Sequence, residues 1–171
     1  DMHPDYLSTT YARQRSEAEG IELIQVQHHH AHMASCMADN GLSQKVIGLV
    51  WDGTGYGSDG SIWGGECLIG DYSGFERFGS IREIPLPGGD KAVKEISRIA
   101  FSLMKDAGLD VSGFENAAIL SAMTEKGLNC PKSSGMGRLF DGVAAICGIK
   151  QGCSYEGQGA VLLEAAAEDS E

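Results

Sequence analysis

Basic residues are scarce in this sequence and long apolar runs are absent from it. The chain has 13 lysines and arginines against 24 aspartates and glutamates, a formal net charge of −11, and no basic cluster. Because nucleic-acid surfaces need positive charge, a nucleic-acid partner is excluded. Apolar runs such as Val46–Trp51 are far shorter than the roughly 20 residues that cross a bilayer, and the first residues are unlike a leader peptide. We expect a soluble, cytoplasmic protein without a membrane partner.

The five cysteines include no Cys-x-x-Cys pair, and their odd number argues against a disulfide framework, so we expect them to be reduced. Glycine, by contrast, is plentiful. Its 24 residues gather at 53–65, 88–89 and 135–159 without a fixed period, which excludes collagen-like and solenoid folds. With 171 residues and 42% hydrophobic content, the chain is long enough for one compact domain.

Strand-like and helix-like patterns follow one another along the chain. The strand-like segments are 21–26, a run at 45–52 that is typical of a strand buried on both faces, and 62–72 and 75–84, which complete an antiparallel meander. The helix-like segments are 10–19, 31–40, 90–108, 116–126, 138–147 and 161–167. This pattern predicts an α/β fold with a mixed sheet and flanking helices.

Four of the five histidines lie at positions 28 to 32, where a helix should begin. His28 and His32 are four residues apart, so their imidazoles would share one helix face and could bind one metal ion. His29 and His32 also share a face, so spacing alone leaves both pairs open. The alternative is a surface histidine run, or histidines that cap the helix.

Asp52 is the best candidate for a third ligand, because it ends a buried strand, where ligands collect in α/β sheets. A turn aspartate that opens a hairpin is the alternative. The following glycines could direct backbone amides at nucleotide phosphates, with a hydroxyl from Thr54. A tight hairpin would need about as many glycines, and the segment is neither a P-loop nor a dinucleotide fingerprint.

Two further segments carry charged residues beside glycine. Glu66 follows Gly64 and Gly65 within a strand, which indicates close approach to another element or a ligand, although a solvent-facing side chain is the commoner case. Arg138 and Asp141 are one helical turn apart and could hold a nucleotide or form a local ion pair.

Several of these segments together resemble the hydrogenase maturation carbamoyltransferase family HypF. The matching motifs are Asp1–Thr9, Val26–His32, Asp52–Gly57, Trp63–Glu66, Leu86–Asp90 and Gly137–Asp141. They correspond to the C-terminal module of that family, which is similar to the tRNA-modifying enzymes Kae1 and TsaD and to antibiotic O-carbamoyltransferases. The resemblance implies one lobe of an actin, sugar kinase and Hsp70-like (ribonuclease H-like) fold. We expect residues 1–171 to form the first lobe and to stop before the second.

The resemblance also implies an activity. HypF uses carbamoyl phosphate and ATP to form carbamoyl-adenylate, and passes the carbamoyl group to the C-terminal cysteine of HypE for the cyanide ligand of nickel-iron hydrogenase. It favours His28 and His32 as ligands of a divalent metal, with Asp52 as the third ligand, and leaves His29 and His30 for support or substrate contact. Iron and zinc suit such ligands, and manganese or magnesium are also compatible. The expected nucleotide-binding residues are Gly53, Thr54, Gly55, Arg138 and Asp141.

Parts of the HypF pattern are missing from this sequence, namely the upstream acylphosphatase-like, zinc-finger and adenylate-forming regions and the second lobe. We therefore expect this chain alone to be inactive. Two alternatives stay open: a fragment of a related tRNA threonylcarbamoyl or O-carbamoyl transferase, and a non-catalytic protein-binding lobe with vestigial histidines.

Overall fold

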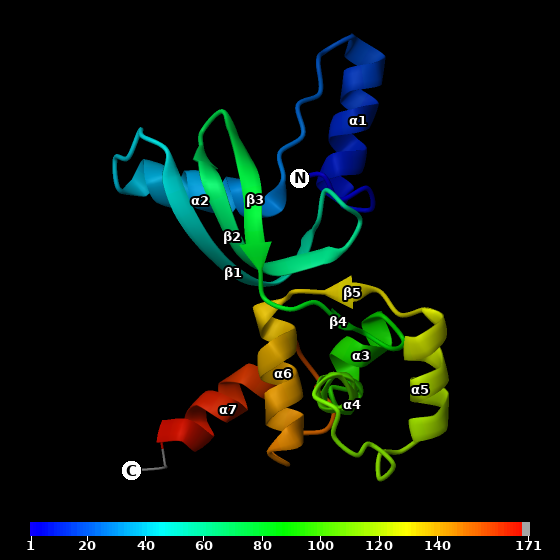
Figure 1. The fold of residues 1–171 in the computed structure, drawn as a ribbon. Helices are drawn as coiled ribbons and strands as arrows, with labels where there is room; N and C mark the ends of the chain where they lie inside the picture. The colour runs from blue at the N-terminus through cyan, green and yellow to red at the C-terminus, as the bar shows by residue number, and fades with distance from the viewer. Residues whose placement is uncertain (169–171) are drawn as a thin grey trace.

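The computed structural model describes residues 1–168. A twisted antiparallel meander and the first two helices of the chain occupy one end of the molecule, and the other helices occupy the opposite end (Figure 1). The elements in chain order are α1 (Leu7–Glu19), α2 (His28–Asp39), β1 (Val46–Tyr56), β2 (Ile62–Asp71), β3 (Gly74–Ser80), β4 (Ile84–Pro85), α3 (Asp90–Lys94), α4 (Ser97–Asp106), α5 (Ala117–Lys126), β5 (Lys132–Ser133), α6 (Met136–Ile146) and α7 (Gln158–Glu168).

The strands form one mixed sheet. β2 pairs antiparallel with β1 and with β3, so the predicted meander is confirmed. At its start, β2 also pairs parallel with β5, at Ile62 and Ser133, and β5 pairs antiparallel with β4. These short strands connect the meander to the helical group, and the predicted α/β class with a mixed sheet and flanking helices is confirmed.

The predicted strand at 21–26 is wrong. Residues 21–27 run as an extended connection between α1 and α2, and Ile21 and Ile24 are exposed. A β-rich segment needs a neighbouring strand to satisfy its backbone groups, and this segment has none within residues 1–168. α1 itself ends as expected at Gly20, which adopts the left-handed conformation with φ of 67°.

Helix α2 begins at His28, three residues earlier than predicted. The side chain of Gln27 caps it by accepting a hydrogen bond from the backbone N–H of His30 at 2.9 Å. Gln is not among the usual capping residues, so the signal for this start in the sequence is weak. The early start places all four clustered histidines within the first two turns of the helix.

The prediction that the strand at 45–52 is buried on both faces is also wrong. In β1, Val50 packs against Met33 and Met37 of α2, whereas Leu49 is 69% exposed on the opposite face. Side chains alternate between the two faces of a strand, and α2 covers one face of β1 among the described residues.

A second core lies between the helices. It is built around Ile96, Ile99 and Ala100 of the α4 region and Ala144 of α6. The helix predicted at 90–108 is divided into α3 and α4 by a break at Glu95, where φ is −102° and ψ is 76°. Within residues 1–168, all five cysteines are free. No helix there is both long enough and apolar enough to cross a membrane.

Candidate metal centre

Three side chains from two elements converge at the amino end of α2. His28 Nε2 lies 2.9 Å from Asp52 Oδ2 and 3.2 Å from His32 Nε2, and His32 Nε2 lies 3.6 Å from Asp52 Oδ2. Ligands bound to one ion at about 2.1 Å in tetrahedral geometry are about 3.4 Å apart. The three distances bracket that separation, so these two nitrogens and one oxygen fit a shared divalent ion.

Local structure explains why these three residues meet. His28 and His32 are one turn apart on α2, and the helix packs against β1, where Asp52 lies. Val50 faces α2, and because side chains alternate along a strand, Asp52 two residues later is directed to the same face.

The Asp52 carboxylate is held in its charged form. Burial raises its pKa, but the hydrogen bond from the Gly53 N–H at 2.6 Å and the contact with His28 outweigh that effect, so the pKa lies below its ordinary value. A carboxylate that is ionised and already oriented is suited to bind a cation.

The other two histidines of the run are not part of this cluster. His29 is fully buried, and burial lowers its pKa, which keeps the ring neutral. Its Nδ1 lies 3.2 Å from the amide nitrogen of Gln27, which can only donate. His30 Nε2 donates to the Asp71 carbonyl oxygen at 2.7 Å and ties α2 to the turn after β2. Both rings support the helix, and a substrate contact by either of them stays a prediction.

The glycines after Asp52 are explained largely by packing. A Cβ at Gly55 would lie 2.3 Å from His29 Cε1, and a Cβ at Gly57 would lie 2.3 Å from Trp63 Nε1. At Gly53, the nearest groups would be Arg138 Nη2 and Glu156 Oε1, each at 3.6 Å. A phosphate-binding role for the backbone at Gly53 and Gly55 stays a prediction.

A pocket of about 760 Å³ opens beside His28 and Asp52. Thr54 also lines it. Its other walls come from the start of α1, from α3 and from the segment before α7. These walls are lined by Tyr6, Asp90, Val93, Lys94, Cys153, Ser154, Tyr155 and Glu156. Sequence reasoning missed the 153–156 segment, although it lies within the glycine-rich stretch at 135–159.

Arg138 and Asp141 form a local ion pair rather than an open site. Both are nearly fully buried, and Arg138 Nη2 lies 3.2 Å from Asp141 Oδ2. Burial raises the pKa of Asp141, and the neighbouring guanidinium offsets part of that rise. Arg138 Nε and Nη1 have no hydrogen-bond partner among residues 1–168. Neither residue lines the pocket, so their role in nucleotide binding also stays a prediction.

Glu66 lies in the interior and not on a solvent face. Its Oε1 accepts hydrogen bonds from Gly64 N–H and Ser134 Oγ, and its Oε2 accepts one from Arg77 Nε at 2.7 Å. Burial raises its pKa, but these hydrogen bonds, that from Arg77 foremost, outweigh it and lower the pKa overall. The Arg77 guanidinium also lies over the Trp63 ring, at 4.2 Å from its centroid. This network joins β2, β3 and the start of α6.

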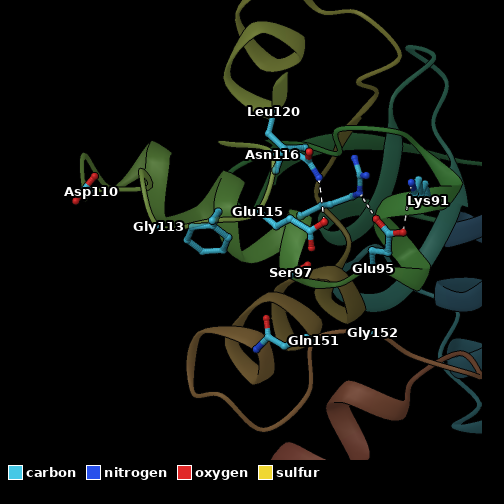
Figure 2. Close-up of a pocket in the computed structure, with 12 residues that line it drawn as sticks. Lys91, Glu95, Ser97, Asp110, Gly113, Glu115, Asn116, Leu120, Gln151 and Gly152 are labelled. Carbon is cyan, nitrogen blue, oxygen red and sulfur yellow. Dashed lines mark hydrogen bonds and ion pairs between the residues drawn. The ribbon is translucent and has the colours of Figure 1, made fainter. Parts of the chain in front are cut away.

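A second pocket, of about 810 Å³, lies on the helical group (Figure 2), and its lining contains no histidine. Its charged side chains have partners: Glu95 pairs with both Lys91 and Arg98, and Glu115 accepts a hydrogen bond from Asn116 (Figure 2). Asp110 accepts hydrogen bonds from the backbone N–H and the hydroxyl of Ser112. The pocket beside His28 and Asp52 is therefore the better candidate site.

Comparisons with known protein families match the chain in two parts. Residues 48–171 match the family described as Carbamoyltransferase, Kae1-like Domain, second subdomain, and residues 1–39 match the HypF Kae1-like domain. The two matches divide the chain between residues 39 and 48. The assignment of residues 1–171 to a single first lobe stays a prediction.

Among curated relatives, the chain is 42% identical to Carbamoyltransferase HypF2 of Cupriavidus necator over 98% of this chain and 22% of that protein. It is 44% identical to Carbamoyltransferase HypF of Rhodobacter capsulatus over 99% of this chain and 24% of that protein. The chain thus spans about a quarter of the length of these relatives.

Two solved structures share the fold. The full-length HypF crystal structure in its phosphate- and nucleotide-bound form superposes with a TM-score of 0.82 at 42% identity, over 96% of this chain and 22% of that one. HypF of T. kodakarensis gives a TM-score of 0.88 at 34% identity, over 100% of this chain and 25% of that one. From its sequence, its fold and the matches along nearly its whole length, this chain belongs to the HypF carbamoyltransferase family and corresponds to part of its Kae1-like domain.

Proposed function

We propose that this chain forms the metal-binding wall of a carbamoyl-transfer site. The observation that carries the proposal is the cluster of His28, His32 and Asp52, two members of which line a pocket of about 760 Å³. Two imidazoles and one carboxylate suit iron or zinc, and manganese or magnesium are also compatible. A bound divalent ion would act as a Lewis acid on a carbamoyl or phosphate oxygen.

The chain's own residues have separate tasks in this proposal. His28 and Asp52 hold the ion at the wall of the pocket, and the more exposed His32 closes the ligand set from the helix. Lys94 lines the same pocket, and its ammonium group together with the Thr54 hydroxyl can bind an anionic group. Asp90 and Glu156 line the pocket as well, so a phosphate group there would depend on a bound ion to offset their negative charge.

The substrates follow from the family. We infer that the whole protein uses carbamoyl phosphate and ATP, makes carbamoyl-adenylate, and transfers the carbamoyl group to the C-terminal cysteine of HypE. The full-length HypF relative was solved in a phosphate- and nucleotide-bound form, which supports a nucleotide site in that relative. In this chain, the nucleotide is proposed to lie near Gly53, Thr54, Gly55, Arg138 and Asp141.

Metal binding tests the first part of the proposal. Calorimetric titration of the chain with Zn²⁺ and Mn²⁺ should give one site, and His32→Ala should weaken it strongly because one of three ligands is lost. His32 suits this test because its side chain is 55% exposed, so its removal leaves the fold intact. Asp39→Asn is the matched control, because it removes an exposed carboxylate from the same helix, outside the cluster. Equal affinities for His32→Ala and wild type would exclude the site.

Carbamoyl transfer tests the second part. The full-length protein that contains this chain should modify HypE when supplied with carbamoyl phosphate and ATP, as measured by the mass of the HypE C-terminal peptide. The His32→Ala form should not, whereas the Asp39→Asn form should. The isolated chain should give no product, and turnover by it would contradict our view that further parts of the protein are needed.

A further inference from the structure

The imidazole of His28 is held by carboxylates at both of its nitrogens. Nε2 lies 2.9 Å from Asp52 Oδ2, on the side of the metal cluster. Nδ1 lies 2.7 Å from Oδ2 of Asp1, which is 27 residues away in the sequence. The Asp1 side chain is 17% exposed in this contact. The two carboxylates therefore approach opposite edges of one ring.

Asp1 is fixed in this place by further contacts. Its Oδ1 accepts a hydrogen bond from the His3 backbone N–H at 2.8 Å. Its carbonyl oxygen accepts bonds from Thr9 Oγ1 and Gln25 Nε2, each at 3.2 Å. The His3 ring in turn lies edge-on to the ring of Tyr56, at the end of β1. Contacts with α1, the connection before α2 and β1 thus hold the carboxylate beside His28.

We propose that Asp1 is a positioning residue for the metal site, which orients His28 as a ligand. A carboxylate that accepts the Nδ1–H of a ligating imidazole fixes its tautomer and its ring plane, and makes Nε2 a stronger donor. His28 Nε2 is the nitrogen that faces Asp52 and His32. This inference rests on the metal site proposed above.

Within the described residues, the second imidazole of the cluster, His32, has no such carboxylate at its other nitrogen. His32 is more exposed, and among residues 1–168 its Nδ1 has no hydrogen-bond partner. The two imidazoles therefore differ in freedom, with His28 oriented before an ion binds and His32 able to adjust to it. Loss of the Asp1 carboxylate should act mainly through His28.

The experiment must separate the orientation of the His28 ring by the Asp1 carboxylate from a purely structural role, in which Asp1 only attaches the amino-terminal segment to α2. Asp1→Asn keeps a side-chain oxygen that can accept the Nδ1–H, and so it preserves the tie while it removes the charge. Asp1→Glu keeps the charge. Asp5→Asn is the matched control, because it removes a carboxylate at an exposed position nearby in the same segment. Thermal unfolding of each variant reports whether the segment stays attached.

The experiment is titration of the chain and these variants with Zn²⁺, together with nitrogen NMR of the Zn²⁺-loaded histidine rings. Asp1→Asn should bind Zn²⁺ about 10-fold more weakly and Asp1→Ala about 10- to 100-fold more weakly. Asp1→Glu should recover part of the affinity, and Asp5→Asn should equal wild type. In the wild type, the Nδ1–H proton of Zn²⁺-loaded His28 should be protected from exchange with solvent. In Asp1→Ala the ring keeps that proton but loses its acceptor, so the proton should exchange faster.

The outcomes separate this inference from the proposed function. If His32→Ala loses Zn²⁺ binding while Asp1→Asn and Asp1→Ala keep wild-type affinity, the metal site stands and the role of Asp1 is refuted. If Asp1→Ala weakens binding but Asp1→Asn does not, Asp1 is a structural tie, and the proposal is again refuted. If the wild type binds no metal, both proposals fall.

Discussion

Replacing Glu66 by Gln should destabilise the fold strongly, although the two side chains have nearly the same size and shape. The Glu66 carboxylate is fully buried, and it accepts hydrogen bonds at both oxygens. In Glu66→Gln, an oxygen retained toward Gly64 and Ser134 leaves the new amide N–H₂ facing the N–H of Arg77. One hydrogen bond becomes a contact between two donors, and the guanidinium loses its closest charged partner.

The size of the stability loss depends on the contacts that Arg77 retains in the variant. Breaking a buried ion pair by removing one partner costs about 3–5 kcal/mol. Arg77 is itself 22% exposed and retains Asp59 at 3.0 Å and the Trp63 ring, so the low end applies. We expect a loss of about 3 kcal/mol in the free energy of unfolding, and a melting temperature lower by about 6–12 °C.

Urea denaturation at pH 7 measures this loss, with Glu76→Gln as control. Glu76 lies on the neighbouring strand β3 with an exposed side chain, so its replacement should change stability by less than about 0.5 kcal/mol. A loss below about 1 kcal/mol for Glu66→Gln would refute the assignment of Glu66 as a buried, ionised partner of Arg77.

The pH dependence gives a second check of the same network. The folded-state pKa of Glu66 lies below its ordinary value of 4.5, so ionised Glu66 stabilises the fold fully above about pH 4.5. That contribution is lost as the pH falls toward the lowered folded-state pKa. The stability difference between wild type and Glu66→Gln should therefore shrink below pH 4.5, and a difference that stays constant down to pH 3 would contradict the pKa assignment.

Two further predictions concern the packing around the site. Gly55→Ala places a Cβ 2.3 Å from His29 Cε1, so it should cost about 1–3 kcal/mol in urea denaturation and weaken Zn²⁺ binding, whereas Gly79→Ala, with open space around its Cβ, should do neither. Leu68→Ala should cost about 2–5 kcal/mol because Leu68 is fully buried beneath the sheet, whereas Leu49→Ala on the exposed face should cost less than about 0.5 kcal/mol. Similar losses of unfolding free energy for Leu68→Ala and Leu49→Ala would show that both faces of the sheet are covered in solution.

The candidate site could be predicted from sequence to the extent that it is local. His28 and His32 share a helix face whatever the rest of the chain does, and Asp52 ends an apolar run, so the three could be named in advance. The choice of His28 over His29 needed the family resemblance, because i, i+3 and i, i+4 pairs both share a face. In the structure, the His29 ring is buried in the space left by Gly55 and is not part of the cluster of His28, His32 and Asp52.

The contributions from distant segments could not be predicted. Asp1 reaches His28 across 27 residues, and the 153–156 segment reaches the pocket from the connection between α6 and α7. Neither contact leaves a periodic pattern in the sequence. The strand predicted at 21–26 failed for a related reason, since strand propensity describes a residue's fit to a neighbouring strand, and none lies beside it in the described structure. The burial of Glu66 could not be predicted either, because its hydrogen-bond partners Arg77 and Ser134 lie far from it in the sequence.

The exposed face of β1 has a consequence for the behaviour of this chain in solution. Ile47, Leu49 and Trp51 alternate along a strand that, within residues 1–168, has a neighbour on one side only. An apolar row with free backbone groups beside it is a template for pairing between molecules. The net charge of −11 opposes such pairing by mutual repulsion between copies. Since salt screens that repulsion over about 10 Å at 0.1 M, raising the ionic strength should drive the chain toward self-association instead of keeping it dispersed.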